Sequence, residues 1–319
     1  MAKKKKNIFK RKLLMALVVL SAFFLIVPHS FANSLKFVQI SDSHIANRKI
    51  NTGYKFLAQS DELLKNSVKK INAVENVDFI FHTGDGVDVP DSELIKRFVV
   101  TMNTLNKPWY FVFGNHDGAY FAQMSKAKYL SYLKQNNQNF KFSNPYYSFS
   151  PKDGYKVIAL DCSINDKLTA NGKIDKVQLE WLKKELNETS KDDAVLIFSH
   201  CPIKEPFPSF HHRLENEVEV RNLLKSFNRP IAVFAGHYHS TKIEQEDKVL
   251  HVASPALVSF PNAFRIVNVH NNKENVIFDF DYQKTDVESV VKEAAGITLG
   301  KKKYLGEEKD RKSTVVISK

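Results

Sequence analysis

The sequence predicts an α/β fold in which buried strands alternate with helices. Short apolar runs of four to six residues, typical of strands covered on both faces, are separated by longer segments with helical spacing of apolar residues. The composition agrees, because 319 residues with 43% hydrophobic side chains and 24 Phe can bury a sizeable core. No linker or internal repeat divides the chain, which favours one large domain over two small ones.

Local patterns predict each strand and helix as far as His239. In residues 61–73, Leu64, Val68 and Ile71 share one helical face. The turn sequence Pro151-Lys152-Asp153-Gly154 favours a hairpin between its two flanking strands. By the same criteria, strands are expected at 35–40, 77–81, 109–113, 146–149, 155–160, 194–198 and 231–234. Helices are expected at 61–73, 91–105, 122–135, 176–186 and 214–227.

The pattern changes after His239, where strands follow one another without intervening helices. They are expected at 249–252, 256–260, 264–269 and 276–282. We expect these strands to complete a sheet in antiparallel fashion. A helix at 287–295 and a Lys- and Glu-rich tail at 301–319 end the chain, and the tail, with little to bury, is expected to be mobile.

Five short polar motifs occur in order along this pattern, and four of them directly follow an apolar run. They are Asp42-Ser43-His44, Gly84-Asp85, Gly114-Asn115-His116-Asp117, Ser199-His200 and Gly236-His237-Tyr238-His239. Carboxylates, imidazoles and an amide are ligands for divalent metals such as Mn, Fe or Zn. Ligands collect outside the carboxyl ends of strands in α/β sheets, so residues distant in sequence are expected to converge on one two-metal site.

In these motifs the chain resembles the calcineurin-like metallophosphoesterase superfamily, and within it the bacterial class III cyclic-nucleotide phosphodiesterase-like branch. The family pattern is Asp-x-His, Gly-Asp, Gly-Asn-His-Asp or Glu, a His, and Gly-His-x-His, and every block is present. The resemblance implies a four-layer αββα sandwich with two mixed sheets and two divalent metal ions. It covers about residues 35 to 283, so 33–283 is assigned to the catalytic domain and 284–319 to the C-terminal helix and tail.

The resemblance also implies a role for each motif residue. Asp42, His44 and His239 would hold the first metal. Asn115, His200 and His237 would hold the second, and Asp85 would bridge both. A shared carboxylate relieves the repulsion between two cations, and a hydroxide between them would attack phosphorus in line.

Two residues beside the proposed ligands are candidates for the remaining chemistry. His116 follows a proposed ligand and is assigned to no metal, so it is the expected proton donor to the leaving oxygen. Asp117 is expected to orient His116. A purely structural histidine is the alternative interpretation of His116. For His82 and Asp88, which flank Asp85, support of the ligands is favoured over ligation.

The first residues have the composition of an export signal. A basic segment containing Lys3 to Lys6 precedes the apolar run 13–27, and Ser30-Phe31-Ala32 offers small residues for cleavage. Residues 1–32 are therefore expected to be a signal peptide, with a retained membrane anchor as the alternative, since a spanning helix usually needs about 20 apolar residues. The protein is accordingly expected to be exported: periplasmic, cell-surface or secreted.

Charge and cysteine content limit the partners. Seven positive and no acidic residues precede Asn33, so the formal charge falls from +12 by seven to +5 in the remaining chain, which does not indicate nucleic-acid binding. Cys162 and Cys201 end apolar runs and are expected to be buried thiols rather than a disulfide. The expected partner is a small phosphate ester. The membrane would be contacted only through an uncleaved N-terminus, and the oligomeric state stays open.

Three functional alternatives remain. The first is a phosphodiesterase or phosphomonoesterase acting on a nucleotide or lipid headgroup. The second is a nuclease of the same superfamily, and the third is a catalytically silent metal-binding surface protein. Arg48, Lys49 and Lys55 follow the first motif and could meet a phosphate, but a surface charge cluster is the default interpretation. The segment 202–212, which contains His211 and His212, could form a wall of the substrate pocket or a solvated loop.

Overall fold

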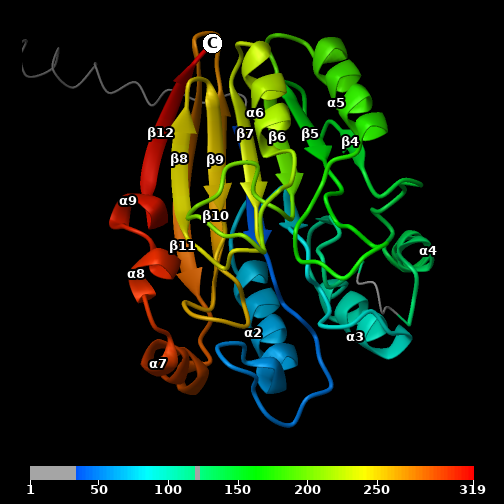
Figure 1. The fold of residues 1–319 in the computed structure, drawn as a ribbon. Coiled ribbons are helices and arrows are strands. Elements are labelled where there is room, and N and C mark those ends of the chain that lie inside the picture. Colours follow the sequence, from blue (N-terminus) through cyan, green and yellow to red (C-terminus); the bar gives the residue numbers. More distant parts are fainter. Residues whose placement is uncertain (1–33, 119–122) are drawn as a thin grey trace, which may run out of the picture. The chain divides into compact units, whose positions relative to one another are not determined.

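A computed structural model describes residues 34–118 and 123–319 of the chain (Figure 1). The expected signal segment, residues 1–32, lies outside the described residues. Within the described ranges, none of the helices has the length and apolar character that crossing a membrane requires.

The first sheet combines a parallel half with an antiparallel half. Strand β1 pairs in parallel with β2, which pairs in parallel with β3, whereas β10, β11 and β12 are antiparallel to their neighbours. The order across the sheet is β12-β11-β10-β1-β2-β3. The bounds are β1 Ser34–Ile40, β2 Phe79–His82, β3 Trp109–Phe111, β10 Ala263–Asn271, β11 Asn275–Lys284 and β12 Ser313–Ser318.

The second sheet is parallel at its centre and antiparallel at both edges. Strands β5, β6, β7 and β9 run in parallel, while β4 pairs antiparallel with β5 and β8 antiparallel with β9. Its order is β4-β5-β6-β7-β9-β8. The bounds are β4 Tyr147–Phe149, β5 Tyr155–Ala159, β6 Ala194–Ser199, β7 Ile231–Ala235, β8 Lys242–Glu246 and β9 Val249–Ala253.

Aromatic side chains join the two sheets face to face. The ring of Phe37 on β1 lies 5.4 Å from that of Phe198 on β6 and 5.0 Å from that of Phe234 on β7. Phe81 on β2 stacks on Phe198 at 3.9 Å. These rings belong to one buried cluster that contains strands of both sheets, so the main core lies between the sheets.

Helices cover the outer faces and make the four-layer sandwich that was expected. On β6, Leu196 joins the core between the sheets, while Val195 and Ile197 join a second cluster with Leu182 of α5 and Leu224 of α6. Apolar residues of α2, α3 and α4 pack in the same cluster as the first sheet. The bounds are α2 Ser60–Asn72, α3 Ser92–Met102, α4 Lys126–Asn136, α5 Lys176–Glu188 and α6 Glu217–Ser226.

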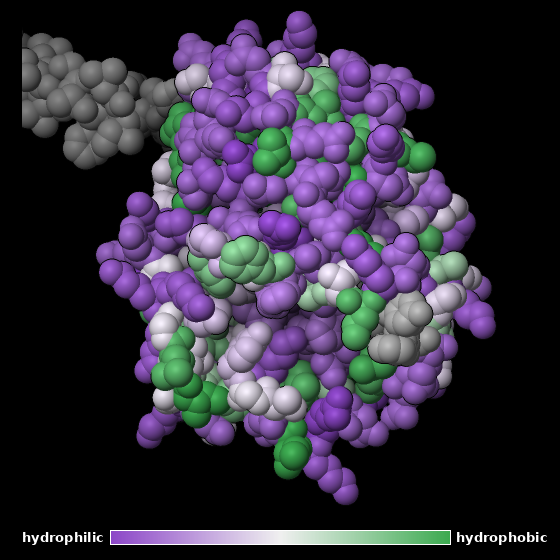
Figure 2. Space-filling view, viewed as in Figure 1, coloured by the Kyte–Doolittle hydropathy of each residue, from purple (hydrophilic) through white to green (hydrophobic). Residues whose placement is uncertain are grey.

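The surface complements this core. The face in Figure 2 is mostly hydrophilic, and its hydrophobic side chains form small separate groups. A short 3₁₀ helix, η1 at Leu57–Gln59, leads into α2. A third small apolar cluster contains Leu63 of α2, Val290 of α7, and also Val258. Helix α7 spans Glu288–Ile297. The cluster attaches the helix predicted at 287–295 to the rest of the fold.

The C-terminal tail differs from the expectation. Residues 301–319 form α8 at Lys301–Leu305, α9 at Glu308–Arg311 and the edge strand β12, and Ile317 is buried. The prediction of a mobile tail was wrong, because backbone pairing with β11 holds β12 rather than a long apolar run. The boundary at residue 283 stays a prediction, and strand β12 beyond it pairs with β11 of the first sheet.

Two strand predictions also need correction. Residues 256–260 form bends and a turn instead of a strand. Their apolar side chains divide between two clusters, with Leu257 in the core between the sheets and Val258 and Phe260 beside α2 and α7. Strand β8, with the sequence Lys-Ile-Glu-Gln-Glu, was missed because an edge strand with one solvated face carries little apolar signal. The strands after His239 also divide between both sheets instead of completing one.

Candidate metal centre

The site lies where the parallel strands of both sheets end. Asp42 follows β1, Asp85 follows β2 and Asn115 follows β3, while His200 and His237 follow β6 and β7. Figure 1 shows β5, β6 and β7 pointing to the same end of the fold. Backbone contacts join the connecting loops, with Asp42 N donating to Gly84 O at 3.0 Å and Gly236 N to His200 O at 3.0 Å.

Five of the seven predicted ligands have left-handed backbone conformations. The φ angles are 52° for Asp42, 38° for His44, 54° for Asp85, 69° for His237 and 52° for His239. Such conformations cost about 1–3 kcal/mol each for residues other than glycine, and they concentrate at functional sites. The fold therefore carries strain at the positions that aim these side chains into one space.

The first cluster contains the three residues expected to hold one metal. One ligand atom each of Asp42, His44 and His239 lies within 4.8 Å of the other two, and all three residues are buried. His239 Nε2 is 3.3 Å from Asp42 Oδ1, and His44 Nε2 is 3.9 Å from the same oxygen.

The second cluster lies beside the first. Asp85, His200 and His237 approach one another in the same way, and Asn115 Oδ1 is 3.1 Å from His200 Nε2. Asp85 Oδ2 is 3.4 Å from His200 Nε2 and 3.5 Å from His44 Nε2. Asp85 thus lies between the clusters, at the place expected of a bridging carboxylate.

A close backbone approach makes room for Asp85. A β-carbon on Gly114 would stand 2.0 Å from Asp85 Oδ1 and 2.4 Å from Asp85 N. Any larger residue at position 114 would therefore displace Asp85. This explains the glycine in the motif Gly114-Asn115-His116-Asp117.

Outer hydrogen bonds turn two imidazoles so that Nε2 faces the clusters. His200 Nδ1 donates to the carbonyl oxygen of Thr83 at 2.7 Å. His239 Nδ1 lies 2.7 Å from Ser259 Oγ. Such partners fix the ring orientation of metal-binding histidines. Ser259 lies in a loop with no polar motif, so sequence reasoning gave no signal for it.

Attraction to neighbouring histidines keeps the buried carboxylates of Asp42 and Asp85 ionised. Burial opposes ionisation of Asp42, but His239 and His200 hold its pKa below the usual range. Burial likewise opposes ionisation of Asp85, whose pKa is lowered by His200, His116 and His44. Burial disfavours the charged form of His200, yet Asp85 raises the pKa of His200 to about 10. The two carboxylates remain anionic at neutral pH and available to cations.

The residues present fit two divalent cations. Asp42 Oδ1 and His237 Nε2 are buried and have no hydrogen-bond partner within the described part of the chain, although both face their clusters. Two carboxylates, four imidazoles and one amide oxygen suit Mn, Fe or Zn. The geometry agrees with the expected grouping, and the role of each residue as a ligand stays a prediction.

His116 lies next to the first cluster. Its ring centroid is 4.5 Å from that of His44, and its backbone N–H donates to Asp85 Oδ1 at 2.9 Å. Its Nδ1 donates to the carbonyl oxygen of Asp88 at 2.7 Å. The Asp88 carboxylate stands 3.6 Å from His116 Nδ1 and 3.7 Å from His44 Nδ1, and these three residues form a third group that could hold a cation, so support by Asp88 rather than ligation stays a prediction.

Asp117 does not orient His116, and that expectation was wrong. Its carboxylate accepts the backbone N–H groups of Gly86, Val87 and Gly114 at 2.9–3.3 Å. Burial and the nearby Asp85 raise the pKa of Asp117 to about 7. Asp117 therefore joins the loops that carry Asp85 and Asn115, and Asp88 contacts His116 in its place.

A family model described as calcineurin-like phosphoesterase matches residues 35–241. The chain belongs to this family. It is 29% identical over 227 residues to a probable glycerophosphodiester phosphodiesterase, GpdQ, of Arcobacter nitrofigilis, covering 69% of this chain and 78% of that protein. It is 24% identical over 276 residues to a manganese-dependent ADP-ribose/CDP-alcohol diphosphatase of Arabidopsis thaliana, with 71% and 87% covered.

Solved structures agree on the fold of this calcineurin-like phosphoesterase. A dimetal phosphatase from Danio rerio superimposes with a TM-score of 0.63 at 17% identity, covering 76% of this chain and 95% of that one. The expected family and the expected two-sheet architecture are both confirmed.

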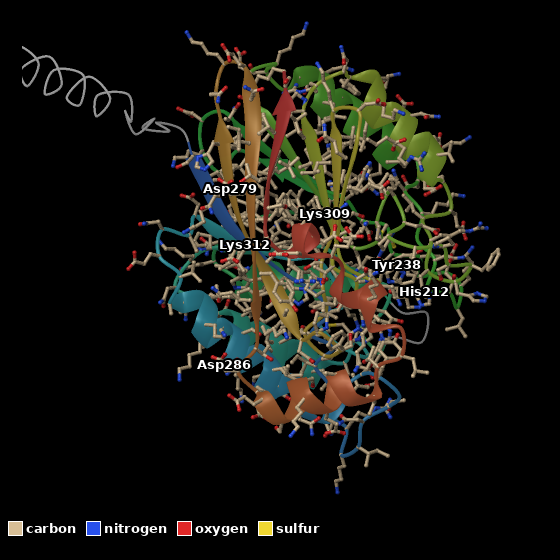
Figure 3. All side chains as sticks on the ribbon, turned by 90° about the vertical axis from the view of Figure 1, so that its left-hand side faces the viewer. His212, Tyr238, Asp279, Asp286, Lys309 and Lys312 are labelled. Atoms are coloured by element: carbon tan, nitrogen blue, oxygen red, sulfur yellow. The ribbon has the colours of Figure 1, made fainter. Side chains whose placement is uncertain are left out.

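Further side chains border the site of this phosphoesterase. His212 and Tyr238, labelled in Figure 3, come from different loops, and their rings lie 6.1 Å apart. His212 is also 5.2 Å from the ring of His237. The segment 202–212 therefore reaches the metal centre through His212, as one of the two sequence interpretations held.

Both cysteines are buried free thiols that form no disulfide, as expected. Cys201 N donates to Cys162 Sγ at 3.0 Å. Cys201 follows His200 but belongs to none of the groups of described residues that could hold a metal.

Proposed function

We propose that this chain is an exported, dinuclear metal-dependent phosphodiesterase acting on a small nucleotide or lipid-headgroup ester. The observation that carries the proposal is the position of Asp85 between two ligand clusters, with His116 directly beside them. Two Mn, Fe or Zn ions, when bound, would neutralise phosphoryl charge and activate a water molecule for attack on phosphorus.

The protein's own residues supply the remaining chemistry. The side chain of His116 is about a third exposed, so it can contact a bound substrate directly. Its Nδ1–H is held by Asp88 O, so when the ring carries a second proton, Nε2 is the nitrogen that can deliver that proton to the leaving oxygen. Asp117 keeps the Asp85 and Asn115 loops together through their backbone N–H groups.

The names of two relatives support a diester over a monoester. One is a probable glycerophosphodiester phosphodiesterase and the other an ADP-ribose/CDP-alcohol diphosphatase. Both names describe substrates in which phosphate is linked on two sides. A proton donor such as His116 is useful for these substrates, because their leaving group departs as an alkoxide or phosphate that benefits from protonation.

Export and partner choice are part of the proposal. The basic and apolar residues before Asn33 support export, with cleavage or retention as a membrane anchor. The charge of +5 on the remaining chain gives no reason to invoke a nucleic-acid substrate. A small ester is therefore proposed as the ligand.

The test compares two substrates on Mn-loaded protein beginning at Asn33. Hydrolysis of bis-p-nitrophenyl phosphate should exceed that of p-nitrophenyl phosphate and should collapse in His116→Ala. A preference for the monoester would instead make the protein a phosphatase. Bound metal without turnover of either ester would favour the catalytically silent interpretation.

A further inference from the structure

A lysine outside the family motifs points into the metal centre. Lys55 Nζ lies 3.3 Å from His44 Nε2 and 3.4 Å from His116 Nε2. The first of these nitrogens belongs to a proposed metal ligand and the second to the proposed proton donor. Lys55 Nζ therefore lies between a proposed metal ligand and the proposed proton donor.

The local backbone fixes the direction of this side chain. Thr52 and Lys55 exchange backbone hydrogen bonds of 3.3 and 3.1 Å, which closes a tight turn. The next residue, Phe56, is buried at 1% exposure, and its N–H donates to Val258 O at 2.7 Å. A lysine between a closed turn and a buried anchor is held in place, unlike one in a free surface loop.

The charge of Lys55 lacks a matching anion. No carboxylate of residues 34–118 or 123–319 forms an ion pair with it within 4.0 Å. Its contacts are two imidazole nitrogens. Once His44 Nε2 binds a cation, that lone pair is no longer available, and the ammonium group needs another acceptor.

We propose that Lys55 is a substrate-binding residue that donates to a non-bridging oxygen of the scissile phosphate. The proposal rests on the proposed phosphodiesterase function and adds to it a contact that no family motif contains. An ammonium group binds phosphoryl oxygens as a compact point charge. With Lys55 on a non-bridging oxygen, His116 Nε2 remains for the leaving oxygen.

This arrangement makes a specific demand on the ligand. The ligand must present a phosphoryl oxygen to Lys55 Nζ beside His44 and His116, whose rings are in edge contact with centroids 4.5 Å apart. Inorganic phosphate meets this demand and is the product-like part common to every candidate ester. It is therefore a suitable probe before the physiological substrate is identified.

The experiment uses the full chain with Mn and three variants. Lys55→Met keeps the length of the side chain without its charge, Lys55→Arg restores the charge, and Lys49→Met removes an exposed lysine from the same loop. Calorimetry measures the dissociation constant for inorganic phosphate, metal analysis gives the Mn content, and hydrolysis of bis-p-nitrophenyl phosphate gives KM and kcat.

We expect Lys55→Met to raise the phosphate dissociation constant and KM about tenfold to a hundredfold, as for loss of a charged hydrogen bond. Mn content should stay unchanged, Lys55→Arg should recover most of the affinity, and Lys49→Met should resemble the wild type. The proposal is overturned if Lys55→Met binds phosphate like the wild type, or if its defect comes with loss of Mn.

The same measurements separate this proposal from the proposed function. Phosphate binding that depends on Lys55 in a protein that hydrolyses no ester would reject the phosphodiesterase function and leave the anion contact supported. If the protein hydrolyses the diester but Lys55→Met changes neither the phosphate affinity nor KM, the phosphodiesterase function is supported and the proposed Lys55 contact is rejected.

Discussion

His116 Nδ1 donates a 2.7 Å hydrogen bond to the backbone carbonyl oxygen of Asp88. Because a carbonyl only accepts, this contact places the proton on Nδ1 and leaves Nε2 facing the site. The backbone of one residue thereby sets the tautomer of another that is 28 positions away in sequence. Its consequence is that His116 can act at Nε2 without being a metal ligand.

The first prediction concerns this imidazole. His116→Ala should lower kcat for the diester by about a hundredfold to ten-thousandfold, the usual range for a lost acid–base group. Mn content should be unchanged, because His116 is assigned to neither ligand cluster. Steady-state kinetics and metal analysis on the same preparation measure both quantities.

Asp88→Asn is a matched control for this variant. It preserves the backbone carbonyl that binds His116 Nδ1 and alters only the carboxylate 3.6 Å away. We therefore expect a smaller loss of kcat than in His116→Ala. Loss of Mn from His116→Ala would show instead that His116 is itself a ligand.

The second prediction tests the shared carboxylate. Asp85→Asn should reduce bound Mn below two per chain and nearly abolish hydrolysis, because Asp85 Oδ2 stands 3.4–3.5 Å from an imidazole of each cluster. Removal of one anion weakens the charge balance of both sites at once. Full activity in Asp85→Asn would refute the bridging assignment.

The third prediction concerns protons released on metal binding. Asp85 raises the pKa of His200 to about 10 in spite of burial, so His200 carries a proton at Nε2 at pH 7 without metal. A metal ion must displace this proton to bind there. Affinity should therefore rise with pH up to about 10. Calorimetric titration with Mn at pH 7 should give heats that depend on the ionisation enthalpy of the buffer.

Two buffers of different ionisation enthalpy at the same pH are sufficient for this test. The dependence should shrink as the pH approaches 10, because His200 is then already deprotonated in part. Heats that are the same in both buffers at pH 7 would mean that His200 is neutral before metal binds.

The motif residues were predictable because sequence order carries their chemistry. Asp42, Asp85 and His200 each follow an apolar strand, and parallel strands bring their carboxyl ends to one edge. The role of Asp117 could not be assigned correctly by its proximity to His116 in sequence. It depends on which backbone groups the side chain reaches after the loops close, and sequence spacing does not contain that information.

Lys55 shows the same limit for charged residues. From the sequence it was one of several cations after the first motif, with a solvated surface as the default interpretation. Only the turn at Thr52 and the buried anchor at Phe56 direct it toward His116. The tail was misjudged for a related reason, since β12 is stabilised by pairing with a strand that lies far from it in sequence.

The fourth prediction concerns acid stability. His251 on β9 is 6% exposed, and burial lowers its pKa to about 4. The unfolded chain binds this proton near pH 6.5 and the folded chain does not. Its contribution is therefore fully present above pH 6.5 and is lost as the pH falls toward 4. The loss amounts to about 3 kcal/mol of unfolding free energy.

Urea unfolding between pH 7 and pH 4.5 measures this slope. His251→Leu should flatten it, whereas replacement of the exposed His211 by Leu should leave it unchanged. An equal decline in His251→Leu and the wild type would assign the acid sensitivity to other groups.

The last prediction tests whether the C-terminal residues stabilise the fold. Asp310 of α9 is fully buried, and its carboxylate accepts the backbone N–H groups of Ile243 and Glu307, each at 2.9 Å. Its carbonyl oxygen accepts from the buried guanidinium of Arg265 at 2.7 Å. Asp310→Ala leaves two backbone donors unpaired and removes the carboxylate nearest to Arg265. It should therefore lower the unfolding free energy by about 3 kcal/mol.

Glu308→Ala, two residues earlier and exposed, is the control and should change stability by less than about 0.5 kcal/mol. The measurement is urea unfolding at pH 7. If the two variants were equally stable, α9 and β12 would contribute little to folding, and the buried contacts of Asp310 would be energetically neutral. A large difference would mean that a stable catalytic domain cannot end at residue 283, because a carboxylate from beyond that boundary binds the backbone N–H of Ile243 on β8.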